Sequence, residues 1–128
     1  MSKICVVLVS DSLERLQMGA MVASVGAVSG REVLVFASMN ALGFFTRKES
    51  ATPAPEGPIG RLMGTRNVPP FKHLFQQAVE VGDARIFPCS MAMDVLALEQ
   101  EDLEPWLQPA TGLTKFLDDA RDSQVWTF

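Results

Sequence analysis

The apolar residues of this chain fall into short continuous runs and longer helical stripes. The first two short runs are rich in β-branched residues and show no polar alternation, which is typical of strands covered on both faces of a parallel sheet. Shorter apolar segments follow near the end of the chain. Together these segments predict strands at 4–9, 32–37, 84–87, 106–108 and 124–128.

Helices are predicted between these strands. In the clearest one, at 71–82, apolar residues recur at i, i+3, i+4, i+7 and i+8. Asp11 and Glu14 predict the start of a helix that runs to about Ser29 and ends at Gly30 in a left-handed cap. Further helices are expected at 40–48, 90–98 and 113–122. The alternation predicts an α/β fold with a five-stranded, mainly parallel open sheet and helices on both faces.

The length of 128 residues predicts a single domain over 1–128. A Pro/Gly-rich loop at about 49–70 interrupts the alternation, and its five prolines and three glycines predict no regular secondary structure. Loops of this length inside a compact domain are usually functional lids, interface arms or disordered. Leu62 and Met63 in its middle suggest that it docks against another surface.

Composition restricts the possible partners. The hydrophobic share of 48% is high for so short a chain and predicts a homo-oligomer that buries apolar surface between subunits. A net charge of -4 gives no electrostatic reason to bind nucleic acid or an anionic membrane. The longest apolar stretch, 18–28, is too short to span a bilayer, and no secretory signal is recognised at the start. We therefore expect a cytoplasmic protein without stable membrane insertion.

Cys89 is the strongest candidate for chemistry. It follows Pro88 at the end of a predicted strand and precedes the helix predicted from Ser90. The first amides of a helix have no intrahelical partner, so they can stabilise a thiolate, which is the nucleophilic form of cysteine. Ligands of open α/β sheets bind at the carboxyl ends of strands, where Cys89 is expected. Ser90 and Met91 are the neighbouring residues that would contact a bound group.

The other chemically active side chains favour structural roles. Cys5 lies among aliphatic residues and is predicted to be core, too far from Cys89 for a disulfide. His73 is the only histidine and is expected on the polar side of its helix. No zinc-ligand spacing and no nucleotide fingerprint occur. We therefore expect no metal and no cofactor.

Two groups of polar residues are weaker candidates for anion binding. Ser10 and Asp11, before the first helix, could cradle a small anion, although Asp11 would oppose a phosphate. Basic residues in and beside the 49–70 loop could place positive charge over an anion such as thiosulfate, but ordinary solvated charge is favoured. These residues are Arg47, Lys48, Arg61 and Arg66.

One stretch resembles a known family. The run from Ala84 to Val95, with its Cys-Ser-Met-x-Met-Asp core, resembles the DsrE/DsrF-like sulfur-relay proteins. The Thr111-Gly112 turn, Phe116-Leu117, the opening strand and the Ala/Gly/Val-rich first helix agree with that resemblance. Two departures are Ser90, where some relatives carry a second cysteine, and the 39–42 segment, which lacks the usual aromatic and glycine pattern.

The resemblance implies a function as well as a fold. It implies a five-stranded parallel sheet, trimers or hexamers, and a cysteine that accepts sulfane sulfur as a persulfide or thiosulfonate, a role that falls to Cys89. Its implied partners are donor and acceptor proteins such as rhodanese-like or TusA-type carriers. Two alternatives stay open: a single-cysteine, peroxidase-like redox protein, and a non-catalytic interaction subunit of a relay complex. Whether the chain is an enzyme or a carrier is also open.

Overall fold

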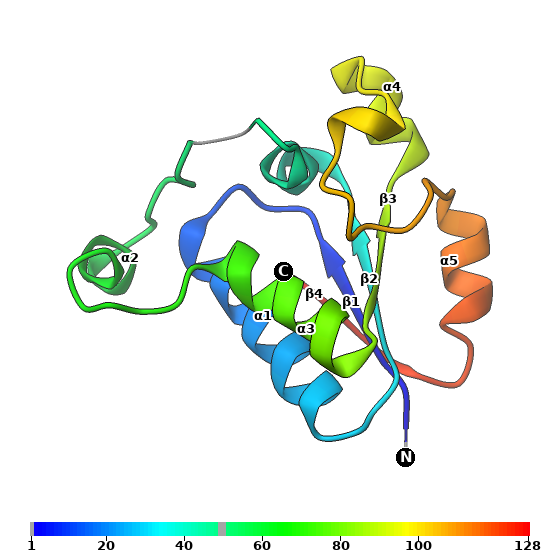
Figure 1. Ribbon diagram of the computed structural model, residues 1–128, viewed down its shortest axis with the longest axis horizontal. Helices are drawn as coiled ribbons and strands as arrows, with labels where there is room; N and C mark the ends of the chain where they lie inside the picture. Colours follow the sequence, from blue (N-terminus) through cyan, green and yellow to red (C-terminus); the bar gives the residue numbers. More distant parts are fainter. Residues whose placement is uncertain (1, 49–50) are drawn as a thin grey trace.

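The computed structural model describes residues 2–48 and 51–128. In that part of the chain the sheet has four strands in the order β3-β2-β1-β4, and every neighbouring pair is parallel. Figure 1 shows the twisted sheet edge-on between two layers of helices. The strands are β1 (Ile4–Leu8), β2 (Val33–Ala37), β3 (Arg85–Pro88) and β4 (Gln124–Thr127).

Helices cover both faces of this sheet, as expected. Two long helices, α1 and α3, lie side by side on one face, and α5 lies on the other (Figure 1). The segments η1 and α4 lie beyond the carboxyl ends of β2 and β3. The helical elements are α1 (Leu13–Val28), η1 (Met39–Phe45), α2 (Pro58–Met63), α3 (Phe71–Gly82), α4 (Ser90–Leu96), η2 (Gln100–Asp102) and α5 (Leu113–Asp119).

The alternation of side chains along β2 explains the two layers. All five residues of this strand are buried, so each face must be covered. Val33 approaches Gly26 of α1, while the ring of Phe36 lies 5.0 Å from that of Phe116 in α5. Successive side chains of a strand point to opposite faces, and the continuous apolar run in the sequence therefore fits a strand between two helical layers.

The strand predicted at 106–108 is wrong. Instead, the segment 108–111 follows the free edge of β3: the amide of Gln108 donates to Ile86 at 2.8 Å, and the amide of Thr111 donates to Pro88 at 2.9 Å. The two donors are three residues apart and their acceptors two apart, and the amide of Ala110, which would donate next in a regular ladder, donates to the side chain of Gln100 instead. The fifth position of the sheet is therefore occupied by an irregular segment rather than by a strand.

The expectation that the 49–70 loop has no regular structure is also wrong, because it contains α2. Residues 49 and 50 lie outside the described residues. The carboxylate of Glu14 in α1 accepts the amides of Glu56 and Gly57, at 2.8 and 2.7 Å. A Cβ atom on Gly60 would clash with that carboxylate in its present position. The amides of the two residues that lead into α2 are thus satisfied by a side chain from another helix.

The ends of the two long helices agree with the sequence-based predictions, except for the residue that caps α1. Ser12, not Asp11, caps α1 by accepting the amide of Arg15 at 3.3 Å. Gly30 has a φ of 89°, in agreement with the predicted left-handed end. The bounds of α3 are those of the predicted helix at 71–82. No helix of the described residues is both long and apolar enough to cross a membrane.

Candidate functional site

Cys89 occupies the junction between β3 and α4. The last paired residues of β2 and β3 are Ala37 and Pro88, and the amide of Cys89 extends this ladder by donating to Ala37 at 2.9 Å. Cys89 is then the N-cap residue of α4, with an extended backbone and no side-chain capping bond. The strand and the helix together hold the thiol at the carboxyl edge of the sheet, where open α/β folds bind ligands.

The amides at the start of α4 are only partly available. The amide of Ser90 donates to the carbonyl of Thr111 at 3.0 Å. The amides of Met91 and Ala92 donate to no backbone carbonyl in the described part of the chain. These two amides are the open donors closest in sequence to Cys89. The amide of Ser90 is therefore not available to an anionic group on Cys89, whereas those of Met91 and Ala92 are.

The thiol lies just beneath the surface. Cys89 is only 5% exposed, while Met91, two residues on, is 47% exposed. The segment 108–111, here called the cover segment, runs beside it and makes a parallel bridge between Thr111 and Cys89. The side chain of Gln100 holds the cover segment from outside, donating to Gln108 and accepting from Ala110, both at 3.1 Å. The cover segment therefore borders Cys89 on one side.

Ser10 and Asp11 lie apart from Cys89. They follow β1, and β2 separates β1 from β3 in the sheet. Two strand spacings of about 4.8 Å put the ends of β1 and β3 roughly 10 Å apart. The hydroxyl of Ser10 accepts the amide of Ser12 at 2.9 Å, and Asp11 is exposed. The structure therefore brings Cys89, Ser90 and Met91 together and leaves Ser10 and Asp11 at the start of α1.

The other thiol and the histidine have the predicted surroundings. Cys5 is fully buried, and its sulfur lies 3.2 Å from the hydroxyl of Ser123. Burial is the main reason why the pKa of the Cys5 thiol is raised above its ordinary value. Both cysteines are free. His73 is exposed on α3, and no group of three or more potential metal-binding side chains occurs in the described residues.

The basic residues around the loop do not converge on the thiol. Arg61 lies in α2 and Arg66 shortly after it, at the opposite end of the molecule from α4 (Figure 1). Arg47 is closer, but its Nε donates to the carbonyl of Leu103 at 2.8 Å. Lys48 is exposed. The interpretation of these residues as ordinary surface charge fits the structure better than an anion site over Cys89.

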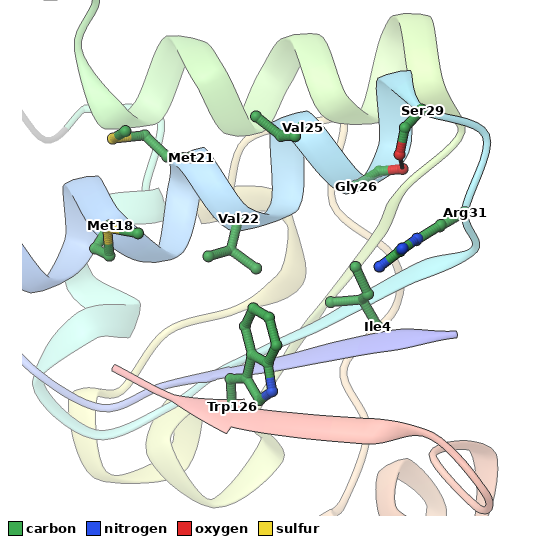
Figure 2. A pocket seen from close by; sticks show the side chains of 9 residues that line it. All are labelled: Ile4, Met18, Met21, Val22, Val25, Gly26, Ser29, Arg31 and Trp126. Atoms are coloured by element: carbon green, nitrogen blue, oxygen red, sulfur yellow. Dashed lines mark hydrogen bonds between the residues drawn. The ribbon is translucent and has the colours of Figure 1, made fainter. Parts of the chain in front are cut away.

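Two features of the surface were not found from the sequence. The helix α4 buries only Ala92 and Met93, so most of its apolar surface is uncovered beside Cys89. A groove of about 370 Å³ runs between α1 and β4 (Figure 2). The groove is lined by Ile4, Met18, Met21, Val22, Val25, Gly26, Ser29, Arg31 and Trp126. Apolar runs on α1 indicated burial, but only the structure shows which positions stay uncovered.

The sheet is all-parallel and has helices on both faces, which defines an α/β protein. Cys89 is buried at the point where β3 leads into α4. A family model described as the DsrE/DsrF/DrsH-like family matches residues 56–128, a stretch that includes Cys89. The chain belongs to this family. No curated protein matches the chain.

Solved structures with this fold come from distant proteins. The MTH1491 protein of Methanobacterium thermoautotrophicum, described as being of unknown function, superposes with a TM-score of 0.72 at 10% identity. The ychN protein of E. coli superposes with a TM-score of 0.71 at 14% identity. In both comparisons all of this chain and all of the other chain are covered. At these identities the likeness establishes the fold.

Proposed function

We propose that this protein is a sulfur carrier that accepts sulfane sulfur on Cys89 and passes it to the thiol of a partner. The observation that carries the proposal is the match to the DsrE/DsrF/DrsH-like family over a stretch that contains Cys89. Membership of this family supports a role related to sulfur relay. The position of Cys89, at a strand end and beside the open amides of Met91 and Ala92, suits such a role.

The transfer needs no oxidant. The Cys89 thiolate attacks the outer sulfur of a donor persulfide, R–S–SH, and the S–S bond of the donor breaks. The donor leaves as a thiolate, R–S⁻, and the outer sulfur with its hydrogen stays on Cys89 as Cys–S–SH. An acceptor thiolate then repeats the attack and restores the Cys89 thiolate. The hydroxyl of Ser90 and the amide of Met91 border the bound sulfur, and Cys89 must become more accessible than its 5% exposure allows.

Mass spectrometry tests this proposal. The protein is incubated with polysulfide, thiosulfate or tetrathionate, and the adduct is located by peptide mapping. We expect a sulfur adduct on Cys89 and none on Cys89→Ser protein. Cys5, fully buried with a raised pKa, serves as an internal control and should stay unmodified. Absence of an adduct on Cys89, or equal modification of the Cys89→Ser protein, would rule out the carrier function.

We also propose that the protein is a homo-oligomer, a trimer or a hexamer, that buries the groove between α1 and β4. Figure 2 shows the side chain of Val22 on α1 pointing toward Trp126 on β4, with Met18 and Met21 further along α1. No charged residue occurs between 16 and 28, and Arg31 is the single charged residue among those that line the groove, so most of this surface can be buried without desolvating a charge. Exposed apolar surface of this kind marks interaction sites.

Analytical ultracentrifugation tests the assembly. Val25 in the groove is 69% exposed, and Val81 on α3, outside the groove, is 73% exposed. Val25→Glu should dissociate the oligomer, while Val81→Glu should leave it intact. If both variants sediment as the wild type does, the groove between α1 and β4 is not the interface.

Thiol chemistry of this kind requires reduced cysteines, and both cysteines are free in this structure. A reducing compartment keeps them so. We therefore propose that the carrier works in the cytoplasm, with protein donors and acceptors of the rhodanese-like or TusA type.

A further inference from the structure

The helix that begins at Cys89 is largely uncovered. Three large apolar side chains of α4 face outward: Met91 is 47% exposed, Val95 is 74% exposed and Leu96 is 46% exposed. Figure 1 shows α4 at the edge of the molecule, beyond the end of β3. A helix with an apolar face and no covering element is an unusual feature of a monomer surface.

The start of α5 lies beside the start of α4. The hydroxyl of Ser90 lies 4.0 Å from the position that a Cβ on Gly112 would occupy. Leu113, the first residue of α5, is 52% exposed. Each of the two helices that begin near Cys89 therefore has an exposed large apolar side chain in its first turn, Met91 and Leu113.

The charge on this surface is negative. From Ile86 to Thr114 the chain has no lysine, arginine or histidine. The same stretch has five acidic residues: Asp94, Glu99, Glu101, Asp102 and Glu104.

Basic residues of neighbouring elements lie beside the later part of that stretch. Lys72 of α3 pairs with Glu104 at 3.5 Å, and Arg47 and Lys48 line one pocket with Glu101 and Asp102. Asp94 is exposed on α4 and makes no ion pair in the described part of the chain. The outer face of α4 therefore keeps the negative charge of Asp94, with exposed Glu99 shortly after the helix.

We propose that the outer face of α4, formed by Met91, Asp94, Val95 and Leu96, is the docking surface for a basic sulfur-carrier protein that presents its cysteine to Cys89. This inference rests on the proposed function and names the partner of the same site. An acidic rim around an apolar patch attracts a partner with lysine or arginine around its own apolar contact. The same rim slows small anionic donors such as thiosulfate without preventing their reaction, because screened like charges at the surface reduce the encounter rate.

Transfer from matched peptide persulfides tests the proposal. Two synthetic peptides of equal length contain one cysteine persulfide beside a leucine, flanked either by lysines or by glutamates. The rate of persulfide formation on Cys89 is followed by mass spectrometry at low and at physiological salt. We expect the lysine peptide to react about tenfold faster at low salt. The difference should shrink as salt is added, because exposed charges are then screened.

Single substitutions locate the effect on α4. Asp94→Lys should remove most of the preference for the lysine peptide. Glu80→Lys on α3 alters the net charge equally and should leave the preference unchanged. Val95→Ser should slow transfer from the lysine peptide, whereas Val81→Ser, at a position of nearly equal exposure (73% against 74%), should not.

The outcomes separate this proposal from the carrier function. If polysulfide loads Cys89 while both peptides react equally, or Asp94→Lys behaves like Glu80→Lys, the docking surface is refuted and the carrier function stands. If neither polysulfide nor either peptide loads Cys89, both proposals fall. Faster reaction of the glutamate peptide would reverse the assigned charge of the partner and refute the proposal.

Discussion

The accessibility of Cys89 should depend on the side chain of Gln100. This residue holds the cover segment by two hydrogen bonds, one donated to Gln108 and one accepted from Ala110. Both bonds are exposed to solvent, so each contributes at the low end of the usual range, about 0.5 kcal/mol. Gln100→Ala removes both and should make opening of the cover segment easier by about 1 kcal/mol, a roughly fivefold larger open population.

Alkylation of Cys89 by iodoacetamide measures this population. If the reagent reaches the thiol through the opened segment, the labelling rate of Gln100→Ala protein should be about fivefold that of the wild type. Gln100→Glu, which keeps an acceptor for Ala110 but loses the donor to Gln108, should fall between them. Cys5 should remain unlabelled in all three proteins, since it is fully buried. Equal labelling of Cys89 in the three proteins would show that another route leads to the thiol.

Three further predictions concern the framework around the site. Phe45→Ala should lower the free energy of unfolding by about 3–5 kcal/mol and Tm by roughly 10–20 °C in calorimetry. The reason is that the ring of Phe45 is fully buried, with its centroid 5.5 Å from that of Phe75 and 6.1 Å from that of Trp106. A Tm shift of only a few degrees would contradict this. The amide of Glu56 is the main reason why the pKa of Glu14 is lowered. The docking of α2 should therefore be fully present above the ordinary pKa of a glutamate, about 4.3, and be lost as pH falls through the lowered value. Hydrogen exchange at Glu56 and Gly57 measures this. Glu14→Gln should weaken protection at neutral pH and remove its loss at acid pH, whereas Asp11→Asn should change neither. Cys5→Ser keeps a hydrogen-bonding partner, since Ser123 lies 3.2 Å from the sulfur, and should leave sulfur loading of Cys89 unchanged; loss of loading would assign Cys5 a part in the transfer.

The sequence alone was sufficient for the alternation of strands and helices. Runs such as 32–37 are uniformly apolar because both faces of their strand are covered, and the apolar stripe of 71–82 predicted the bounds of α3. The junction of β3 and α4 at Cys89 was also predicted, because Pro88 ends a strand and small or flexible residues follow it. These are local effects, in which a residue and its near neighbours decide the backbone.

Tertiary contacts decided the rest. The segment at 106–108 has a strand-like composition, but the amide of Ala110 donates to Gln100 and not to β3, so the cover segment is irregular. The short helix α2 lies in a Pro/Gly-rich stretch whose entry is held by Glu14, more than forty residues earlier, through the amides of Glu56 and Gly57. Thr111, which bridges to Cys89, is close to it only in the folded chain. The sequence of neighbouring residues determines which secondary structure a segment prefers. Which groups an amide or a thiol contacts depends on how distant segments pack together.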